Sequence, residues 1–147
     1  MMPRSERSRT THGSALVEFA LAMPFLLVLL AGVLDYGQAL GKATAVANAA
    51  RIGAQYGSSS PSRASDAAGI QAAAIHSAPS FSGLTVTSAK LCQCPGGQAV
   101  SCAGTCVSGR KQVYVQVTVR ATSSAIFRYS GLPFTGNIAA RISMRAQ

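Results

Sequence analysis

A run of apolar residues from Ala15 to Leu34 limits what this chain can fold into more than any other feature, and Glu18 is its only charged side chain. A helix over this run would be about 30 Å long, which is the thickness of the hydrocarbon core of a bilayer. The run therefore predicts a membrane-spanning helix. A charge at the centre of such a helix costs about 2.5–3.5 kcal/mol on insertion scales, so an acid inside it is a candidate functional residue.

The charges on either side of the run predict its orientation. The segment before it has a positive excess, made by Arg4, Arg7 and Arg9 against Glu6. The first basic residue after it is Lys42. Basic residues beside a first apolar helix hold that end of the helix in the cytoplasm. We therefore expect a cytoplasmic N-terminus and an extracytoplasmic C-terminal domain.

This orientation divides the chain into a basic leader at 1–13, a transmembrane helix at 14–35 and an extracytoplasmic domain at 36–147. A cleaved secretory signal is the alternative. Its apolar core would be about 7–15 residues long and would be followed by a small-x-small cleavage site. The run from Phe19 to Leu34 is longer than that, and Ala31-Gly32-Val33 matches such a site poorly. The sequence therefore favours an anchored chain.

Two segments resemble a known family. Residues Gly13 to Pro24 read GSALVEFALAMP, and residues Ala49 to Ala54 read AARIGA. Both are similar to the TadE-like family, whose members are minor pilins or pseudopilins of the Tad/Flp tight-adherence pilus system. The resemblance covers the N-terminal part of the chain, and the remainder matches only as a loose pattern of polar loops and short strands.

The resemblance implies pilin-type processing. In type IV pilin-like proteins a prepilin peptidase cuts after a Gly that ends a basic leader, and the fifth residue of the mature chain is Glu. Here the cut would fall between Gly13 and Ser14, and Glu18 would be the fifth residue. The implied partners are the bacterial inner membrane, the prepilin peptidase, other pilins and minor pilins, and the Tad platform proteins.

Glu18 has a simpler explanation and a functional one. Near a helix end its carboxylate can reach the lipid headgroups at small cost, and it favours the positive end of the helix dipole. In the assembly hypothesis, cleavage creates an α-amine on Ser14, one helical turn away. Glu18 of one subunit then pairs with this amine of its neighbour, and such a pair is far stronger in a low-dielectric core than in water.

Pro24 and Arg51 can each be interpreted in two ways. Pro24 removes a backbone donor, so we expect a kinked or loosened helix around Ala20 to Pro24. This is either an ordinary transmembrane kink or a local melting that lets the helix repack in a filament. Arg51 is either a partner for an acid on a neighbouring subunit or a solvated residue. Together with Glu18 and Phe19 they are the candidate assembly residues.

The residues after Leu34 continue the same helix, because they are rich in Ala and contain no Pro before Pro61. This predicts one helix from Ser14 to Gly57, about 65 Å long. Gly53 and Gly57 belong to stripes of small residues that permit close approach of another helix or of the protein's own sheet. We favour the sheet for part of this helix.

A serine-rich segment, Ser58 to Ser62, should end the long helix. A second helix is expected from Asp66 to Ser77, capped by Ser65 and stopped by Pro79. His76 on this helix is expected to be a surface or packing residue rather than a ligand.

Three later segments predict strands. Apolar and polar residues alternate cleanly in Val113–Arg120 and Ile138–Arg145, and less cleanly in Leu84–Leu91. A small antiparallel sheet of three strands packed on a helix follows. The predicted fold class is α+β and pilin-like, with a long N-terminal helix laid on this sheet. The aromatic link Ile126–Phe134 is expected to cover the sheet edge.

Four cysteines, Cys92, Cys94, Cys102 and Cys106, crowd the loop between the first two strands. Cys102 and Cys106 have the spacing of a zinc knuckle, whereas Cys92 and Cys94 are too close for one. Because the bacterial periplasm is oxidising, we predict two disulfides and no metal site. Cys92 and Cys94 should pair with Cys102 and Cys106, with the connectivity open.

Composition excludes several functions. The net charge is +9, with 13 Lys and Arg against 4 Asp and Glu, which could attract nucleic acid, anionic lipid or acidic polysaccharide. The bases are scattered and Trp is absent, so no nucleic acid partner is expected. Two His and no Gly-rich phosphate loop leave no catalytic residues, cofactor or enzyme activity to propose.

The predicted function is a minor pilin or pseudopilin that takes part in assembly of a Tad-type pilus for surface adhesion. It would be a single-pass protein of the bacterial inner membrane with a periplasmic domain, and it could enter an extracellular pilus. The alternative is an uncleaved, membrane-tethered receptor or adhesin whose disulfide loop is the contact surface.

Overall fold

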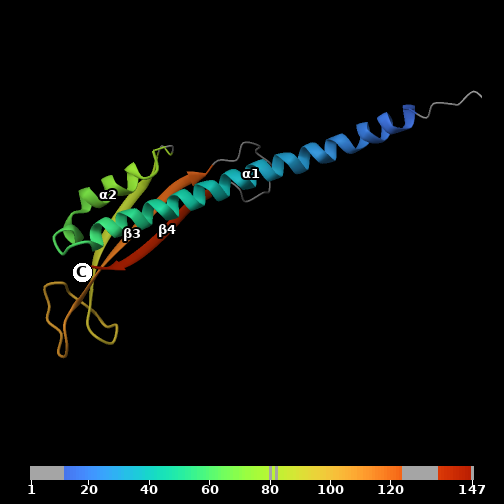
Figure 1. The fold of residues 1–147 in the computed structure, drawn as a ribbon. Coiled ribbons are helices and arrows are strands. Elements are labelled where there is room, and N and C mark those ends of the chain that lie inside the picture. Colours follow the sequence, from blue (N-terminus) through green and yellow to red (C-terminus); the bar gives the residue numbers. More distant parts are fainter. Residues whose placement is uncertain (1–11, 80, 82, 124–135, 147) are drawn as a thin grey trace, which may run out of the picture.

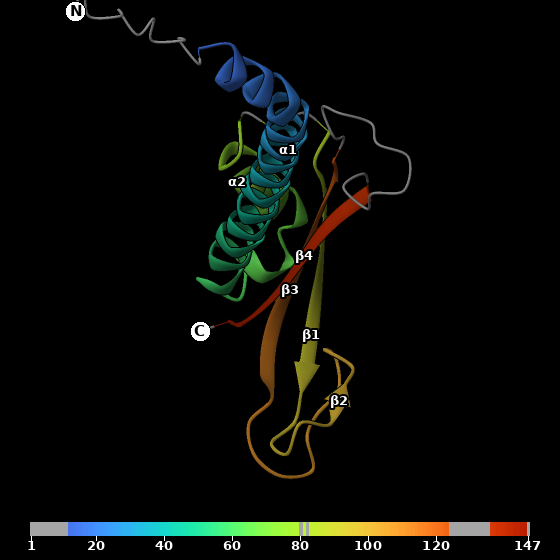
Figure 2. The same ribbon diagram turned by 90° about the vertical axis from the view of Figure 1, so that its right-hand side faces the viewer.

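The structure is a computed structural model that describes residues 12–79, 81, 83–123 and 136–146. Two helices cover one face of an antiparallel sheet, with strand order β2-β1-β3-β4 (Figures 1 and 2). The elements are α1 (His12–Ser58), the 3-10 helix η1 (Arg63–Ser65), α2 (Ala67–His76), β1 (Thr85–Gln93), β2 (Ala99–Val100), β3 (Gln112–Ser123) and β4 (Gly136–Arg145). The predicted α+β class is confirmed.

Only the C-terminal half of α1 packs against the sheet. Helix α1 has 47 residues, about 70 Å, and lies on β3 and β4, while α2 lies on β1. The face of α1 toward the sheet consists of small and medium apolar residues three or four apart, a helical stripe. Its fully buried members are Val46, Ala49, Ala50 and Ala54. These short side chains let the helix axis approach the sheet closely.

Strand β3 supplies the opposite side of this core. Val115, Val117 and Val119 are completely buried. Because side chains alternate along a strand, the residues between them point to the other face of the sheet. In the register, Val117 pairs with Ile142 of β4, and Val119 pairs with Val86 of β1. The predicted strands in these three segments are therefore confirmed, with antiparallel pairing.

The sheet has a fourth strand that the sequence did not predict. Strand β2 has two residues and pairs with the end of β1, with Cys92 opposite Val100 and Gln93 opposite Ala99. It lies inside the cysteine-containing loop, and two residues are too few to show a period of alternation. The predicted aromatic link 126–134 lies outside the described residues.

The start of α2 differs from the prediction by one residue. Asp66, not Ser65, is the N-cap, and its Oδ1 accepts a hydrogen bond from the Gly69 N–H at 2.9 Å. Ser65 instead ends η1, and its hydroxyl accepts a hydrogen bond from Lys90 at 3.0 Å. Both residue types are good caps, so the inserted 3-10 turn decided which one took the position. The long helix ends at Ser58, within the serine-rich segment expected to end it.

The same Asp66 joins the two helices. Its Oδ2 accepts a hydrogen bond from the Tyr56 hydroxyl of α1 at 2.9 Å, and the Arg63 guanidinium lies 5.0 Å from the centre of the Tyr56 ring. The backbone hydrogen bond from Gly69, followed by the one from Tyr56, lowers the pKa of the Asp66 carboxyl. The hydrogen bond to Asp66 raises the pKa of the Tyr56 hydroxyl. The ionised acid is thus held between α1 and α2.

Two glycines of α1 provide a matched test of the helix–sheet packing. A Cβ at Gly57 would lie 2.8 Å from Val115 Cγ1 and 2.9 Å from Ile70 Cδ1, whereas a Cβ at Gly41 would meet no atom within 4 Å. We expect Gly57→Ala to destabilise the domain by about 1–3 kcal/mol, as overpacking does. Gly41→Ala should stabilise it by about 0.5–1 kcal/mol through helix propensity. Thermal unfolding of the full chain in detergent, followed by near-UV circular dichroism, measures both, and shifts of the same sign would contradict the packing.

The Asp66 contact predicts a pH dependence of stability. A carboxyl whose pKa is lowered in the folded state stabilises the fold above its unfolded pKa, and this contribution is lost as pH falls through the folded pKa. At neutral pH the natural chain should therefore be more stable than Asp66→Asn, which keeps the capping oxygen but not the charge. The difference should shrink as pH falls below the ordinary value of 3.8. Paired unfolding curves across this range measure it, and a difference that does not change with pH would refute the role of the charge.

Candidate functional site

The N-terminal part of α1 is an uncovered apolar surface. Every residue from Ser14 to Leu30 is exposed, and Phe25 exposes 75% of its surface. Among the described residues, one helix is long and apolar enough to cross a membrane, Ser14–Ser58. An exposed apolar surface of this size marks a site of contact with lipid or with other apolar helices. Figure 1 shows this part of α1 extending beyond the sheet and α2.

The residues of the predicted processing site lie at the start of this surface. Gly13 is in the first turn of α1, which begins at His12. Ser14 and Glu18 are exposed and four residues apart, so they lie on one face of the helix, about 6 Å apart along its axis. Phe19 is exposed beside Glu18. The folded domain therefore leaves these side chains accessible to an enzyme or to another subunit.

Helix α1 continues without interruption through Pro24. Pro24, Phe25, Val28 and Leu29 line an open apolar hollow of about 420 Å³ on the helix surface. Proline cannot donate a hydrogen bond to the carbonyl four residues before it, which loosens the helix locally. Figure 2 shows the N-terminal turns of α1 leaving the direction of the rest of the helix. The hollow has the size and polarity to receive apolar side chains of a neighbouring helix.

Arg51 lies on the side of α1 away from the sheet. Its neighbour Ala50 and the residue one turn on, Ala54, are both buried, whereas Arg51 is exposed. It forms no hydrogen bond or ion pair with another residue in the described part of the chain. The guanidinium is therefore accessible to a group from another molecule.

Asp35 is a buried acid that directly follows the apolar run, and the sequence analysis assigned it no role. It is 4% exposed, and Ala31, one turn earlier, is 8% exposed. These two residues mark the point where cover of α1 begins. A buried carboxylate needs polar partners, and no buried side-chain N or O atom in the described residues lacks one. The signal in the sequence was the position of this acid, directly after an apolar run.

The four cysteines form two disulfides, Cys92–Cys102 and Cys94–Cys106. This agrees with the predicted pairing of the first two cysteines with the last two, and it supplies the connectivity that the sequence left open. The two bonds are interleaved in the chain, so each restrains the loop closed by the other. The Lys111 ammonium donates hydrogen bonds to the carbonyls of Cys102 and Gly104 from within the same loop.

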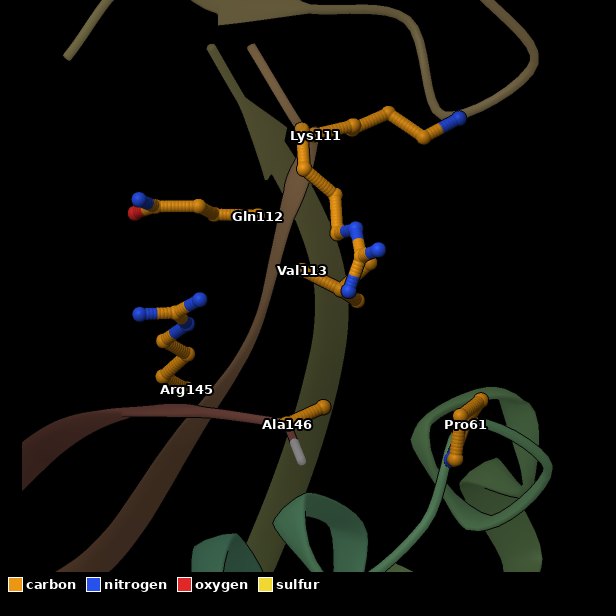
Figure 3. A pocket seen from close by; sticks show the side chains of 7 residues that line it. Pro61, Lys111, Gln112, Val113, Arg145 and Ala146 are labelled. Atoms are coloured by element: carbon orange, nitrogen blue, oxygen red, sulfur yellow. The ribbon is translucent and has the colours of Figure 1, made fainter. Parts of the chain in front are cut away.

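A basic pocket lies where this loop meets the sheet. It has a volume of about 570 Å³ and is lined by Pro61, Arg110, Lys111, Gln112, Val113, Arg145 and Ala146. Figure 3 shows Gln112 and Arg145 extending to the same side of the strands, while Pro61 approaches from the helical layer. The bases appeared scattered in the sequence. Pairing of Tyr114 with Arg145 places the end of β4 beside the start of β3, and Arg110, two residues before β3, lines the same pocket.

Comparison with known proteins identifies the exposed segment. The family model described as TadE-like protein matches residues 13–55, which are most of α1. No curated protein and no solved structure matches the chain. The match includes Glu18 and Arg51, both of which the sequence analysis had selected. The resemblance to the TadE-like family is therefore confirmed over residues 13–55.

Proposed function

We propose that this protein is a minor pilin or pseudopilin that takes part in assembly of a Tad-type pilus. The observation that carries the proposal is the exposed apolar part of α1, which begins with the TadE-like residues Gly13 to Pro24 and extends beyond the folded domain. A soluble domain would cover such a surface. A subunit that passes from lipid into a filament keeps it available, because lipid tails and neighbouring helices are equally apolar. The TadE-like family is not an enzyme family.

The mechanism begins with insertion into the bacterial inner membrane. The basic leader stays in the cytoplasm, residues 14–35 span the bilayer and the domain from residue 36 lies in the periplasm. Two disulfides support this assignment, because such bonds persist in an oxidising compartment. A prepilin peptidase then cuts between Gly13 and Ser14. Removing the charged leader leaves a helix end that can be withdrawn from the bilayer.

Assembly follows by lateral association of the exposed helices. Side chains near Pro24 interdigitate with those of neighbouring pilins, and Tad platform proteins supply the site where this occurs. The new Ser14 α-amine of one subunit pairs with Glu18 of the next. The isolated acid is costly in an apolar medium, and an opposite charge offsets that cost there. Arg51, exposed farther along α1, provides a contact between subunits outside the bilayer.

The proposed function predicts how the chain is processed. Protein purified from native host membranes should begin at Ser14, and its intact mass should be lower by four hydrogens than that of the reduced chain, because two disulfides form. Gly13→Ala should leave the leader attached. N-terminal sequencing and intact mass measure both. A chain that begins at Met1 or Met2 would instead favour the tethered receptor or adhesin, and a start beyond Ala31 would indicate a cleaved secretory signal.

The proposed function also predicts that the charge of Glu18 is needed for assembly of the pilus. Glu18→Gln keeps the size of the side chain and removes its charge, so insertion and cleavage should be normal while pili on the cell decrease about tenfold or more, as expected for loss of a charged hydrogen bond. Gln38→Ala, at an exposed position of α1 after the apolar run, is the control, and cells with this variant should form normal numbers of pili. Counting pili by electron microscopy tests this. Normal piliation of Glu18→Gln would refute the pairing.

A further inference from the structure

Acidic residues are absent from the entire second half of this chain. The four Asp and Glu are Glu6, Glu18, Asp35 and Asp66, and all precede residue 67. The bases from residue 67 onward are Lys90, Arg110, Lys111, Arg120, Arg128, Arg141 and Arg145. The strands and the cysteine-containing loop therefore carry positive charge without any carboxylate side chain of their own. From residue 67 onward every charged side chain is basic, whereas the first part of the chain contains both signs of charge.

The arginines of the strands lie on the face of the sheet that the helices do not cover, here called the outer face. Arg120, Arg141 and Arg145 are exposed, and they alternate with buried residues of β3 and half-buried residues of β4. Arg120 pairs with Ala139, so Arg141 is its diagonal neighbour, about 7–8 Å away. Arg141 and Arg145 are separated by about 13 Å along β4. Together they form a row across two strands.

This row continues into the basic pocket, because Arg145 belongs to both (Figure 3). Arg110 lines the other part of the pocket. The nearby Lys111 is engaged with the carbonyls of Cys102 and Gly104. By contrast, the guanidinium groups of Arg110 and Arg145 have no hydrogen bond or ion pair to another described residue. Their donors are available to a ligand.

No acid of the described chain can compensate the outer face. Asp66 is held between α1 and α2 by Tyr56 and Gly69, on the helical side of the molecule. Asp35 is buried on α1. Like charges on one face repel each other, so a polyanion bound to this face would relieve the repulsion.

We propose that the outer face and the pocket at its end bind an acidic polysaccharide, with carboxylates on the arginines. The planar guanidinium matches a carboxylate with two parallel hydrogen bonds. Neutral hydrogen-bonding groups separate the arginines on this face, among them Thr118 opposite Arg141, Ser143 between Arg141 and Arg145, and Gln116 opposite Ser143. Hydroxyl and amide groups between cations suit a polymer whose charges are separated by neutral sugar rings.

Two other polyanions fit less well. Proteins that bind single-stranded nucleic acid provide aromatic platforms, and Tyr114 is the only aromatic residue on the outer face among the described residues. The anchoring bilayer lies far from the pocket end of the outer face. After Leu34 the 24 remaining residues of α1 rise about 36 Å before Ser58, which precedes the pocket residue Pro61. This distance is several Debye lengths at physiological salt. The argument against the bilayer depends on the proposed membrane anchoring. The charge distribution on the outer face does not depend on it.

Binding of the full chain, held in nanodiscs of zwitterionic lipid, to immobilised alginate tests the proposal at about 0.15 M salt. Neutral dextran, single- and double-stranded DNA, and vesicles containing anionic lipid are the comparison ligands. Arg141→Gln combined with Arg145→Gln should weaken alginate binding about tenfold or more. The matched control, Arg63→Gln combined with Lys90→Gln, removes the same charge from the helical side and should bind like the natural chain. Circular dichroism confirms that both variants are folded.

Several results would overturn the proposal. These are unchanged alginate binding by the Arg141 and Arg145 variant, an equal loss in the control, equal retention on dextran, or tighter binding to DNA or anionic vesicles than to alginate. The assay contains no pilus and no peptidase. Absence of alginate binding would therefore not contradict the proposed assembly function. Failure of processing or piliation would likewise not contradict alginate binding.

Discussion

The close approach of α1 to the valines of β3 is the contact on which the rest of this structure depends. Ala49, Ala50 and Ala54 are fully buried there, and the helix comes so near that Gly57 has no room for a methyl group. This packing uses only the second half of a continuous helix. Because α1 is continuous, holding its second half on the sheet sets the direction in which the apolar part leaves the domain, up to the bend of the N-terminal turns (Figure 2). The apolar segment is therefore presented by the domain rather than attached to it by a flexible linker.

That arrangement separates folding from assembly. The core consists of residues from about Val46 onward, and the interhelical contact at Asp66 and the two disulfides also lie in this part of the chain. The apolar part of α1 contributes no residue to that core. Exchanging lipid for protein around Ser14 to Leu30 then leaves the domain unchanged. In the proposed assembly, such a subunit enters a filament without partial unfolding. Helix α1 connects the apolar part directly to the folded domain.

The sequence predicted the elements that are determined by patterns among neighbouring residues. The helix over the apolar run, the alternation in β3 and β4, and the helix end within Ser58 to Ser62 each depend on neighbouring residues, and the structure confirms them. The features that were predicted wrongly or not at all depend on contacts in three dimensions. Asp66 displaced Ser65 as the cap because a 3-10 turn precedes α2, and the two residues of β2 acquire their strand conformation by pairing with β1. Which cysteines pair, and which arginines share a face, follow from the register between strands distant in sequence.

The distribution of charge follows the same division of the molecule. Each acid of the chain precedes the strands in the sequence. Asp66 joins the two helices, Asp35 is buried at the first covered turn of α1, and Glu18 lies in the apolar run. The strands carry only bases. If solubility alone had set this pattern, mixed charges would serve equally well and would avoid repulsion across the sheet. Under the two proposals, segregation gives the two ends of the molecule different partners, apolar helices at one end and an anionic polymer at the other. The proposed role in an adhesive pilus would use both, since contact with neighbouring subunits must leave another surface free to meet the environment.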